Sequence, residues 1–412
     1  MTALPLPERV GCAIAGGGPA GVMLGYLLAR SGVAVLVCEK HRDFLRDFRG
    51  DTIHPSTLQV MHELGLLDAF LALPHQEVRE LHGLVGDTDI TVADFSHLPT
   101  RCRFVALMPQ WDFLDFLAER AAAHAGFHLA MEADVEELIE EGGRVVGLRG
   151  RRPEGPFAVR ADLVVGADGR HSTVRQRAGF AVVNRGAPID VLWMRLSKRP
   201  GDPQETGGRL NYGRMLITLN RGDYWQCAFV IRKDGYAAVH AKGLAMLRDE
   251  IAEIAPFLRD RVHELKDWDD VKLLTVAVDR LDRWWRPGLL CIGDAAHAMS
   301  PIGGVGINLA IQDAVAAANL LAGPLRDGVL SDSSLAAVER RRTLPTRLTQ
   351  ALQLMVQRRF LGPLIGADRP MAAPWQALLF NRFPPLRRLP ARIVGIGFRP
   401  EHVHIPAVGG VA

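Results

Sequence analysis

The 412-residue chain has few cysteines and almost no net charge. Its five cysteines are scattered with no CxxC pair, so neither a cysteine zinc site nor a disulfide framework is indicated. They are interpreted as small core residues of a protein in a reducing cytoplasm. The formal net charge of +3 is small for this length and gives no basic footprint for nucleic acid. We therefore expect a cytoplasmic protein with no metal site and no nucleic-acid partner.

The sequence also lacks an uninterrupted apolar run long enough to cross a membrane. Pro5, Pro7, Glu8 and Arg9 stand where a secretory signal would need an apolar stretch, so no export signal is expected. The most apolar run, residues 302–323, is interrupted by Asn308, Asp313 and other polar residues, and it predicts a buried helix. The basic residues between Arg387 and Arg399 are interpreted as a solvated face. Membrane association is not expected.

The first clear motif is a βαβ pattern near the N-terminus. An apolar strand, residues 10–15, runs into Gly16-x-Gly18-x-x-Gly21, and a helical run and a second β-branched strand follow. Gly16 permits a tight turn, Gly18 lets backbone approach a pyrophosphate, and Gly21 lets the helix pack against the strand. An anion is favoured at the helix N-terminus by free N–H groups and by the helix dipole. The pattern predicts a dinucleotide site.

Glu39 ends the second strand, eighteen residues after Gly21. A carboxylate at this place accepts hydrogen bonds from two ribose hydroxyls and disfavours a 2′-phosphate. The expected ligand is therefore FAD or NAD rather than NADP.

Two later segments have the same strand-then-loop character. Residues 163–175 read as a strand, an Asp168-Gly169 turn and a helix capped near Ser172. Residues 289–308 read as a strand that delivers Asp294, followed by a glycine loop that enters a helix. Between the two segments, residues 189–278 have the pattern of antiparallel strands with one helix, 244–258.

These patterns predict an α/β fold with a discontinuous nucleotide domain and a second domain. We expect residues 1–180 and 280–330 to form a Rossmann-like domain, 181–279 an antiparallel-sheet substrate domain, and 331–412 a helical C-terminal segment. Within the first domain, helices are predicted at 55–67 and 110–125, a strand at 104–108 and a hairpin turn at 141–144.

Taken together, the Gly16 to Gly21 motif with Glu39, the Asp168-Gly169 segment and the Gly293-Asp294 segment stand in an order that resembles one family. The chain is similar to the class A flavoprotein monooxygenases, the para-hydroxybenzoate hydroxylase-like FAD-dependent aromatic hydroxylases. The resemblance covers roughly residues 10–325.

The resemblance implies noncovalent FAD, NADPH or NADH as transient electron donor, and O2. It places FAD contacts at Gly16, Gly18, Gly21, Glu39, Lys40, Arg49, Gln110, Val135, Asp168, Asp294, Gly306, Ile307 and Asn308. Asp168 would serve both FAD and the visiting NAD(P)H, and Asp294 the ribityl chain. The implied reaction is hydroxylation of an aromatic ring through a flavin C4a-hydroperoxide by a monomer or homodimer. No catalytic side chain is assigned, although His54, His297 and Tyr212 are available.

The substrate strands depart from the best-known family members, which carry an arginine for a carboxylate. Here the hairpin reads Met215 to Asn220, with neutral Thr218 among apolar residues. A phenol, quinone or polyketide-like aromatic is therefore expected instead of a benzoate. Strand alternation predicts that one face of the hairpin lines the pocket, completed by two family positions. The expected pocket residues are Thr52, Leu216, Thr218, Asn220 and Pro301.

Three other functions fit the same motifs. An FAD-dependent reductase or dehydrogenase shares the fold, because oxygen insertion cannot be read from FAD motifs. A flavin-dependent halogenase is disfavoured, since the WxWxIP pattern is missing and Trp284-Trp285-Arg286-Pro287 does not replace it. A non-redox FAD-fold binding protein is disfavoured by the intact Asp294 and glycine loop.

Overall fold

The first sheet is built around the strand that precedes the glycine motif. The computed structural model describes residues 5–45, 52–367, 370 and 372–408. Strands run in the order β19-β20-β11-β1-β2-β8, and β20, β11, β1, β2 and β8 are parallel. Their bounds are β1 Arg9–Ala15, β2 Val35–Cys38, β8 Phe127–Ala130, β11 Gly155–Gly166, β19 Trp285–Arg286 and β20 Leu289–Cys291. The predicted βαβ unit is confirmed, with helix α1 (Pro19–Arg30) between β1 and β2.

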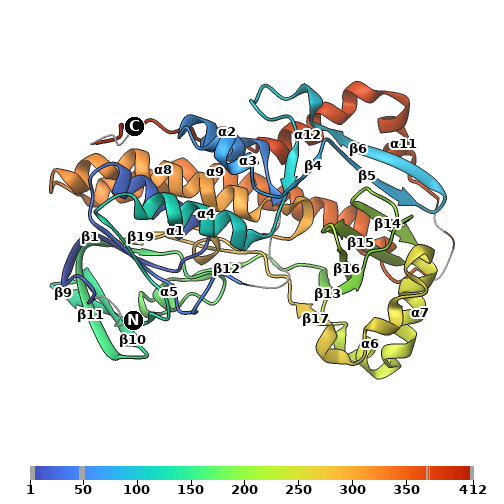
Figure 1. Ribbon diagram of the computed structural model, residues 1–412, viewed down its shortest axis with the longest axis horizontal. Helices are drawn as coiled ribbons and strands as arrows, with labels where there is room; N and C mark the ends of the chain where they lie inside the picture. Colours follow the sequence, from blue (N-terminus) through green and yellow to red (C-terminus); the bar gives the residue numbers. More distant parts are fainter. Residues whose placement is uncertain (1–4, 46–51, 368–369, 371, 409–412) are drawn as a thin grey trace.

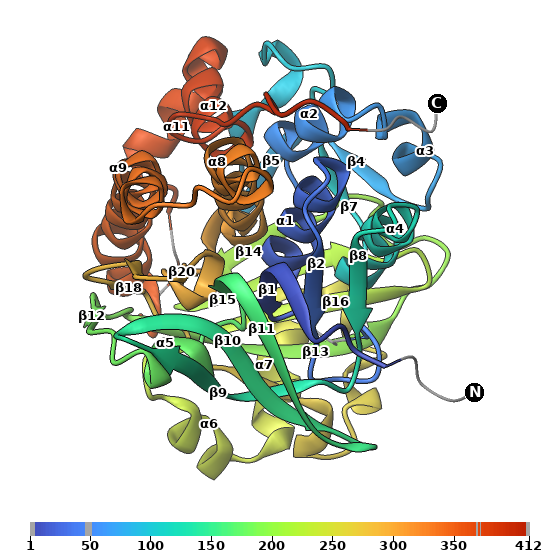
Figure 2. The ribbon, with the colours of Figure 1, turned by 90° about the vertical axis from the view of Figure 1, so that its left-hand side faces the viewer.

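Helices cover one side of this sheet and an antiparallel ribbon covers the other. Figure 2 shows α8 (Gly306–Arg326), α1 and α4 (Gln110–Ala122) on one side, and strands β9 (Asp134–Glu141) and β10 (Arg144–Arg152) on the other. The ribbon turns at the predicted hairpin, where Arg144 pairs with Glu141.

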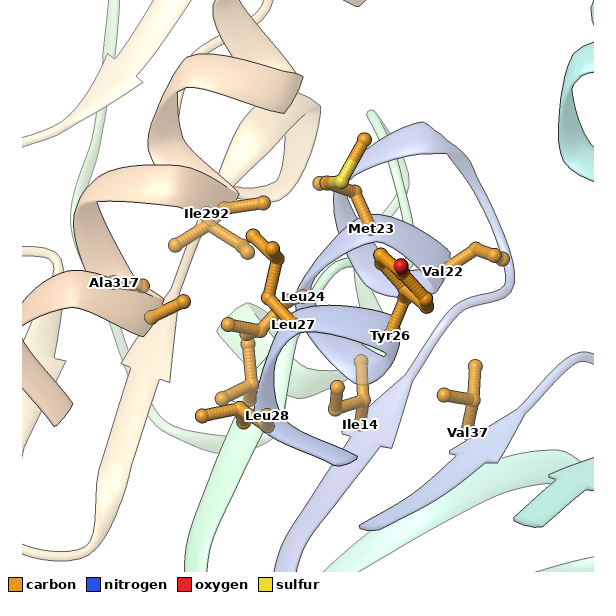
Figure 3. Close-up of a cluster of buried hydrophobic side chains, with 14 of the residues drawn as sticks. Ile14, Val22, Met23, Leu24, Tyr26, Leu27, Leu28, Val37, Ile292 and Ala317 are labelled. Carbon is orange, nitrogen blue, oxygen red and sulfur yellow. The ribbon is translucent and has the colours of Figure 1, made fainter. Parts of the chain in front are cut away.

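The core of this domain lies between α1, the sheet and α8. Leu24, Leu27 and Leu28 of α1 are fully buried and lie near Ile292 and Ala317, while strand residues lie beneath them (Figure 3). By length and composition, the segment 302–326 is the one candidate membrane span among the described residues, but 83% of its apolar window is buried inside the protein. The predicted buried helix is therefore confirmed.

The second sheet has the order β17-β13-β16-β15-β14-β5-β6. Its strands are β5 Glu80–Val85, β6 Thr88–Asp94, β13 Ile189–Ser197, β14 Gly207–Asn211, β15 Arg214–Asn220, β16 Tyr224–Arg232 and β17 Lys272–Leu274. Helix α7 (Leu244–Ile254) packs on one face, and α6 (Tyr236–Lys242) precedes it (Figure 1).

Two details of this sheet differ from the sequence-based expectation. Strands β5 and β6 come from residues expected in the first domain, because β5 pairs in parallel with β14. The strand expected at 271–278 is only three residues long, since the N–H of Val276 donates to the carboxylate of Asp190 instead of continuing the ladder.

The remaining elements join the two sheets and form the C-terminal segment. A three-stranded sheet, β3-β7-β4, and a two-stranded ribbon, β12-β18, lie between them. The bounds are β3 Thr52–Ile53, α2 Pro55–Glu63, α3 Leu67–Leu71, β4 Gln76–Val78, β7 Val105–Leu107, α5 Thr173–Arg177, β12 Val182–Asn184, β18 Asp279–Leu281, α9 Asp332–Val356, α11 Trp375–Arg382 and α12 Arg388–Gly395.

A buried charged network ties the third motif segment to α8 and α9. Asp313 accepts from His297 Nε2 at 2.6 Å, from Arg342 Nε at 2.8 Å and from the Gly293 N–H at 3.1 Å. Arg342 also donates to Glu401. Burial alone would raise the pKa of Asp313, but His297 and Arg342 hold it below its ordinary value. His297 is therefore a structural residue.

Replacing Asp313 with alanine leaves the Arg342 guanidinium, which is 1% exposed, without its main counter-charge. We expect Asp313→Ala to lower the free energy of unfolding by roughly 3–5 kcal/mol, as for other broken buried pairs. The control is Asp327→Ala, which removes an exposed pair with Arg326 and should cost about 1 kcal/mol or less. Equal losses in denaturant unfolding of the two variants would contradict a stabilising network.

Candidate functional site

Four adjacent parallel strands end together at one edge of the first sheet. Ala15 of β1 is level with Gly166 of β11 and with Cys38 of β2, and Gly166 is level with Cys291 of β20. The glycine motif, Glu39, Asp168 and Asp294 follow these strand ends by one to three residues. Ligands of open α/β sheets bind at the carboxyl ends of the strands. The three motif segments are therefore brought together at one site.

The glycine turn has the shape of a phosphate cradle. Gly16 has φ +106°, and a Cβ there would lie 2.3 Å from the carbonyl oxygen of Ala167. A Cβ at Gly21 would lie 1.9 Å from the Gly16 carbonyl oxygen, whereas a Cβ at Gly18 would meet nothing within 4 Å. No side chain caps the N-terminus of α1. The open space and free helix N–H groups fit the pyrophosphate of FAD.

Glu39 holds the same turn from the neighbouring strand. Its carboxylate accepts from the N–H of Gly17 at 2.9 Å and of His41 at 3.1 Å, and its backbone carbonyl accepts from Ala133. This last bond brings the start of β9, with Val135, beside Glu39. A carboxylate beside the cradle fits a ribose.

Three of the predicted FAD contacts, Lys40, Arg49 and Gln110, have less structural support. Gln110 is the first residue of α4, with Pro109 at the N-cap. Lys40 is exposed next to Glu39. Arg49 lies outside the described residues.

The carboxylate of Asp168 is held by hydrogen bonds from residues four and six positions later in the sequence. Its carboxylate accepts from the hydroxyl of Ser172 at 2.5 Å and from the N–H of Val174 at 3.0 Å, and Ser172 caps α5 as predicted. Burial raises the pKa of Asp168, while these hydrogen bonds act in the opposite direction. The side chain therefore fixes the turn, and the backbone at Gly169 is left open, since a Cβ there would meet nothing within 4 Å.

Arg170 is a site residue that the sequence reasoning missed. Its Nε donates to Asp294 Oδ2 at 3.2 Å, and both side chains are about one-third exposed. The pair links the second motif segment to the third. A charged residue directly after the Asp-Gly turn was the available signal.

The N-terminus of α8 forms another side of the site. A Cβ at Gly306 would meet nothing within 4 Å, and no side chain caps the helix. Asn308 is buried, and its Oδ1 accepts from the hydroxyls of Ser56 at 2.6 Å and Thr57 at 2.9 Å. The Asn308 side chain thus docks α8 on α2, so only backbone groups of residues 306–308 can serve a ligand at this helix end.

Side chains on the β15 face predicted to line the pocket have partners within the protein, and their role in the pocket stays a prediction. Leu216 is fully buried in the cluster under α7, Thr218 donates toward the Gly207 carbonyl, and Asn220 donates to the Gln204 carbonyl. Met215, on the other face, and Ile302 of the glycine loop pack against the same apolar cluster of Ile189, Val230 and Ile365. The predicted alternation along β15 is confirmed, with Leu216 on the face that α7 covers.

Tyr212, one of the available side chains, is 47% exposed in the β14–β15 turn. Pro301 begins the short helical turn that contains the loop glycines.

The glycine loop is anchored by Thr52 and His54. Thr52 Oγ1 donates to the Gly304 carbonyl at 2.9 Å, so its hydroxyl supports the loop. His54 is 1% exposed and lies between the carbonyls of Gly304, at 3.1 Å, and Val394, at 2.9 Å. Gly304 has φ +63°, and a Cβ there would lie 2.3 Å from Thr52 Oγ1. Burial lowers the pKa of His54 to about 4.

This shift predicts a pH dependence of stability. In the unfolded chain His54 takes up a proton near its ordinary pKa of 6.5, but in the folded protein only near pH 4. Its contribution is therefore complete above pH 6.5 and is lost as the pH falls toward 4, by about 3 kcal/mol at 1.36 kcal/mol per pKa unit. As the pH is lowered from 6.5 to 4, the free energy of unfolding should fall more steeply for wild type than for His54→Asn. Parallel curves would show that His54 is not buried neutral.

Comparisons with known proteins agree with this site. A family model described as FAD binding domain matches residues 9–351. The chain is 36% identical over 401 residues to 6-methylpretetramide 4-monooxygenase of Streptomyces rimosus, covering 95% of both chains. It is 30% identical over 318 residues to 12-dehydrotetracycline 5-monooxygenase/anhydrotetracycline 6-monooxygenase of Streptomyces rimosus subsp. rimosus, covering 74% of this chain and 61% of that relative.

A solved structure supports the fold. PqsL of P. aeruginosa, in complex with 2-aminobenzoylacetate, superposes with a TM-score of 0.74 at 23% identity, covering 87% of this chain and 98% of PqsL. The predicted fold class and the predicted FAD cofactor are confirmed. The chain belongs to the FAD binding domain family and is a class A FAD-dependent aromatic monooxygenase.

Proposed function

We propose that the enzyme uses NAD(P)H and O2 to hydroxylate a neutral, polycyclic phenol of the polyketide type. Two observations support this substrate class. The relative that matches over 95% of both chains acts, by its name, on 6-methylpretetramide. The face of β15 that meets the glycine loop carries Met215 and Ile217 and no charged side chain.

Bound FAD would supply the redox chemistry, accepting reducing equivalents from NAD(P)H and activating O2. The chain's own residues bind and orient. The α1 N–H groups would hold the pyrophosphate, Glu39 the adenosine ribose and Asp294 the ribityl chain. The N-terminus of α8, at Gly306 to Asn308, would place the positive end of a helix dipole at the flavin pyrimidine and favour negative charge there.

The substrate position is inferred from one row of residues across the second sheet. Gly208 pairs with Ile217 on one side and with Gly83 on the other, and Ile217 pairs with Ala228, which pairs with Trp193. Directly paired residues share a face of the sheet. A Cβ at Gly208 would meet only the Ile217 side chain, at 4.0 Å. The small residues leave room for a planar ring between Ile217 and the loop at Ile302.

This position also accounts for the absence of a charged anchor. Met215, of the same face, packs against the same apolar cluster as Ile302, and Ile217 packs against Val191 and Val276. An apolar wall that faces the glycine loop would exclude water from the reacting ring. A neutral aromatic compound fits such a wall better than a benzoate, whose carboxylate would be buried without a partner.

The experiment that tests the proposal is a screen of phenolic polyketides with the purified holoenzyme. The expected result is NAD(P)H oxidation stimulated by a polycyclic phenol, with O2 consumed and a product heavier by one oxygen atom. Stimulated reduction of the aromatic without O2 consumption would instead identify a reductase on the same fold.

A larger side chain at Gly208 tests the proposed substrate position. Gly208→Val should raise the KM for the aromatic at least tenfold while leaving FAD affinity unchanged, because the new side chain occupies the space beside Ile217. The matched control is Gly207→Val, one residue earlier and on the opposite face, with Thr218 as its strand partner. The position is refuted if Gly208→Val turns over like wild type or if the control shows the same loss. Circular dichroism checks that both variants fold.

A further inference from the structure

A second pocket, separate from the FAD cradle, is lined by arginines. It has a volume of about 500 Å³ and is lined by residues of β12, β18 and α9 and of the segments directly after β12 and α9. This volume is within the range of small-molecule sites. The lining residues are Asn184, Arg185, Arg280, Arg347, Gln350, Ala351, Leu354 and Arg358. Four of the eight are arginines from three different segments of the chain.

Two of the four arginine side chains, Arg280 and Arg358, are positioned by hydrogen bonds to neutral groups. Arg280 Nη1 donates to Oε1 of Gln350 at 3.2 Å, and Gln350 is 1% exposed. Arg358 Nη2 donates to the backbone carbonyl of Arg185 at 2.7 Å. Within the described residues, none of the four arginines forms a salt bridge with a carboxylate. The site therefore gathers positive charge that the described chain does not neutralise.

The positive charges of the pocket arginines repel one another. Burial lowers the pKa of Arg280, and Arg185 and Arg347 lower it further, while Asp282 acts in the opposite direction. Like charges held together without a protein counter-ion are stabilised by a bound anion, and guanidinium groups suit phosphate because they bind it through two parallel hydrogen bonds.

The remaining wall of the pocket is apolar. Arg347, Ala351 and Leu354 lie at helical spacing on α9, and Arg358 follows in the helical turn Gln357–Leu361. A ligand with phosphate groups at one end and a flat base at the other would use both the guanidinium groups and this wall. We propose that the pocket binds a nucleotide through its phosphate groups.

The same helix connects the pocket to the FAD site. Gln350 Nε2 donates to the carbonyls of Asp279 and Ala298, and Gln353 Nε2, one turn further along α9, donates to those of Ser300 and Ile302. These carbonyls lead directly into the loop with Gly304. A nucleotide that contacts Gln350 would therefore be separated from the glycine loop by the backbone segment to which Gln350 and Gln353 donate.

Two nucleotides have this chemistry. One is the reductant NAD(P)H, which rests on the proposed function, and the other is a free nucleotide such as ADP, which does not. The test uses the FAD-loaded enzyme, so that the dinucleotide cradle is occupied, and flavin fluorescence reports any loss of FAD. Probes are ADP, 2′,5′-ADP and inorganic pyrophosphate, with adenosine as the phosphate-free comparison.

Calorimetric titration should find binding of the phosphate-bearing probes, weaker with added salt, and none of adenosine. The double variant Arg280→Gln/Arg347→Gln should lose at least tenfold in affinity for ADP. The control Arg259→Gln, an exposed arginine at the end of a short helical turn in the second domain, should bind like wild type. No binding of any phosphate-bearing probe, or equal affinity in the double variant, overturns the site.

Steady-state kinetics of the same variants identify the source. A KM for NAD(P)H raised at least tenfold, with kcat retained and ADP acting as a competitive inhibitor, assigns the pocket to the reductant. Loss of ADP binding with an unchanged KM assigns it to a separate nucleotide. An inactive enzyme that still binds ADP in an arginine-dependent way would refute the proposed reaction but not the site.

Discussion

The register of four parallel strands is the constraint on which the site depends. Ala15, Cys38, Gly166 and Cys291 end level with one another, so loops far apart in the chain start from the same edge. The requirement is steric as well as topological. A Cβ at Gly16 would overlap the Ala167 carbonyl, and the Ala167 N–H in turn donates to the Ala15 carbonyl. The first and second motif segments can meet only because Gly16 has no side chain.

The helices on this edge are fixed by buried polar contacts rather than by apolar packing alone. Asp313 binds the Gly293 N–H from α8, and Asn308 accepts two hydroxyl groups from α2. Both contacts fix α8, whose N-terminus has no side-chain cap. An anionic ligand is then stabilised without a dense cluster of basic side chains. This explains how a nearly neutral chain can hold a polyanionic cofactor.

The second sheet contributes shape rather than charge. One of its faces is covered by α7, and on the other Met215 packs against the same apolar cluster as Ile302 of the glycine loop. The glycine and alanine residues in the row from Gly83 to Ala228 have little or no side chain, which leaves space on that face. In the proposed function, the polar edge of the first sheet binds the cofactor and the apolar face of the second sheet receives the substrate.

Local patterns predicted the first domain well because a glycine turn, a cap or a hairpin is specified by neighbouring residues. The βαβ unit, the cap at Ser172 and the helix at Gln110 are of this kind. The sequence failed where contacts are distant. Alternation in β15 defines two faces but not which of them α7 covers, and nothing local indicates that β5 pairs with β14. The Arg170–Asp294 pair likewise depends on a separation of 124 residues.

The central claim is that residues beyond the ends of β1, β11 and β20 bind one FAD together. The most direct measurement is the FAD dissociation constant of Asp294→Ala, because Asp294 is the side chain that the third strand delivers and only Arg170 pairs with it among the contacts described. Loss of one charge-assisted hydrogen bond, about 1.5–3 kcal/mol, predicts roughly ten- to hundredfold weaker binding in a variant with normal circular dichroism. Unchanged FAD affinity in that folded variant would contradict the shared site.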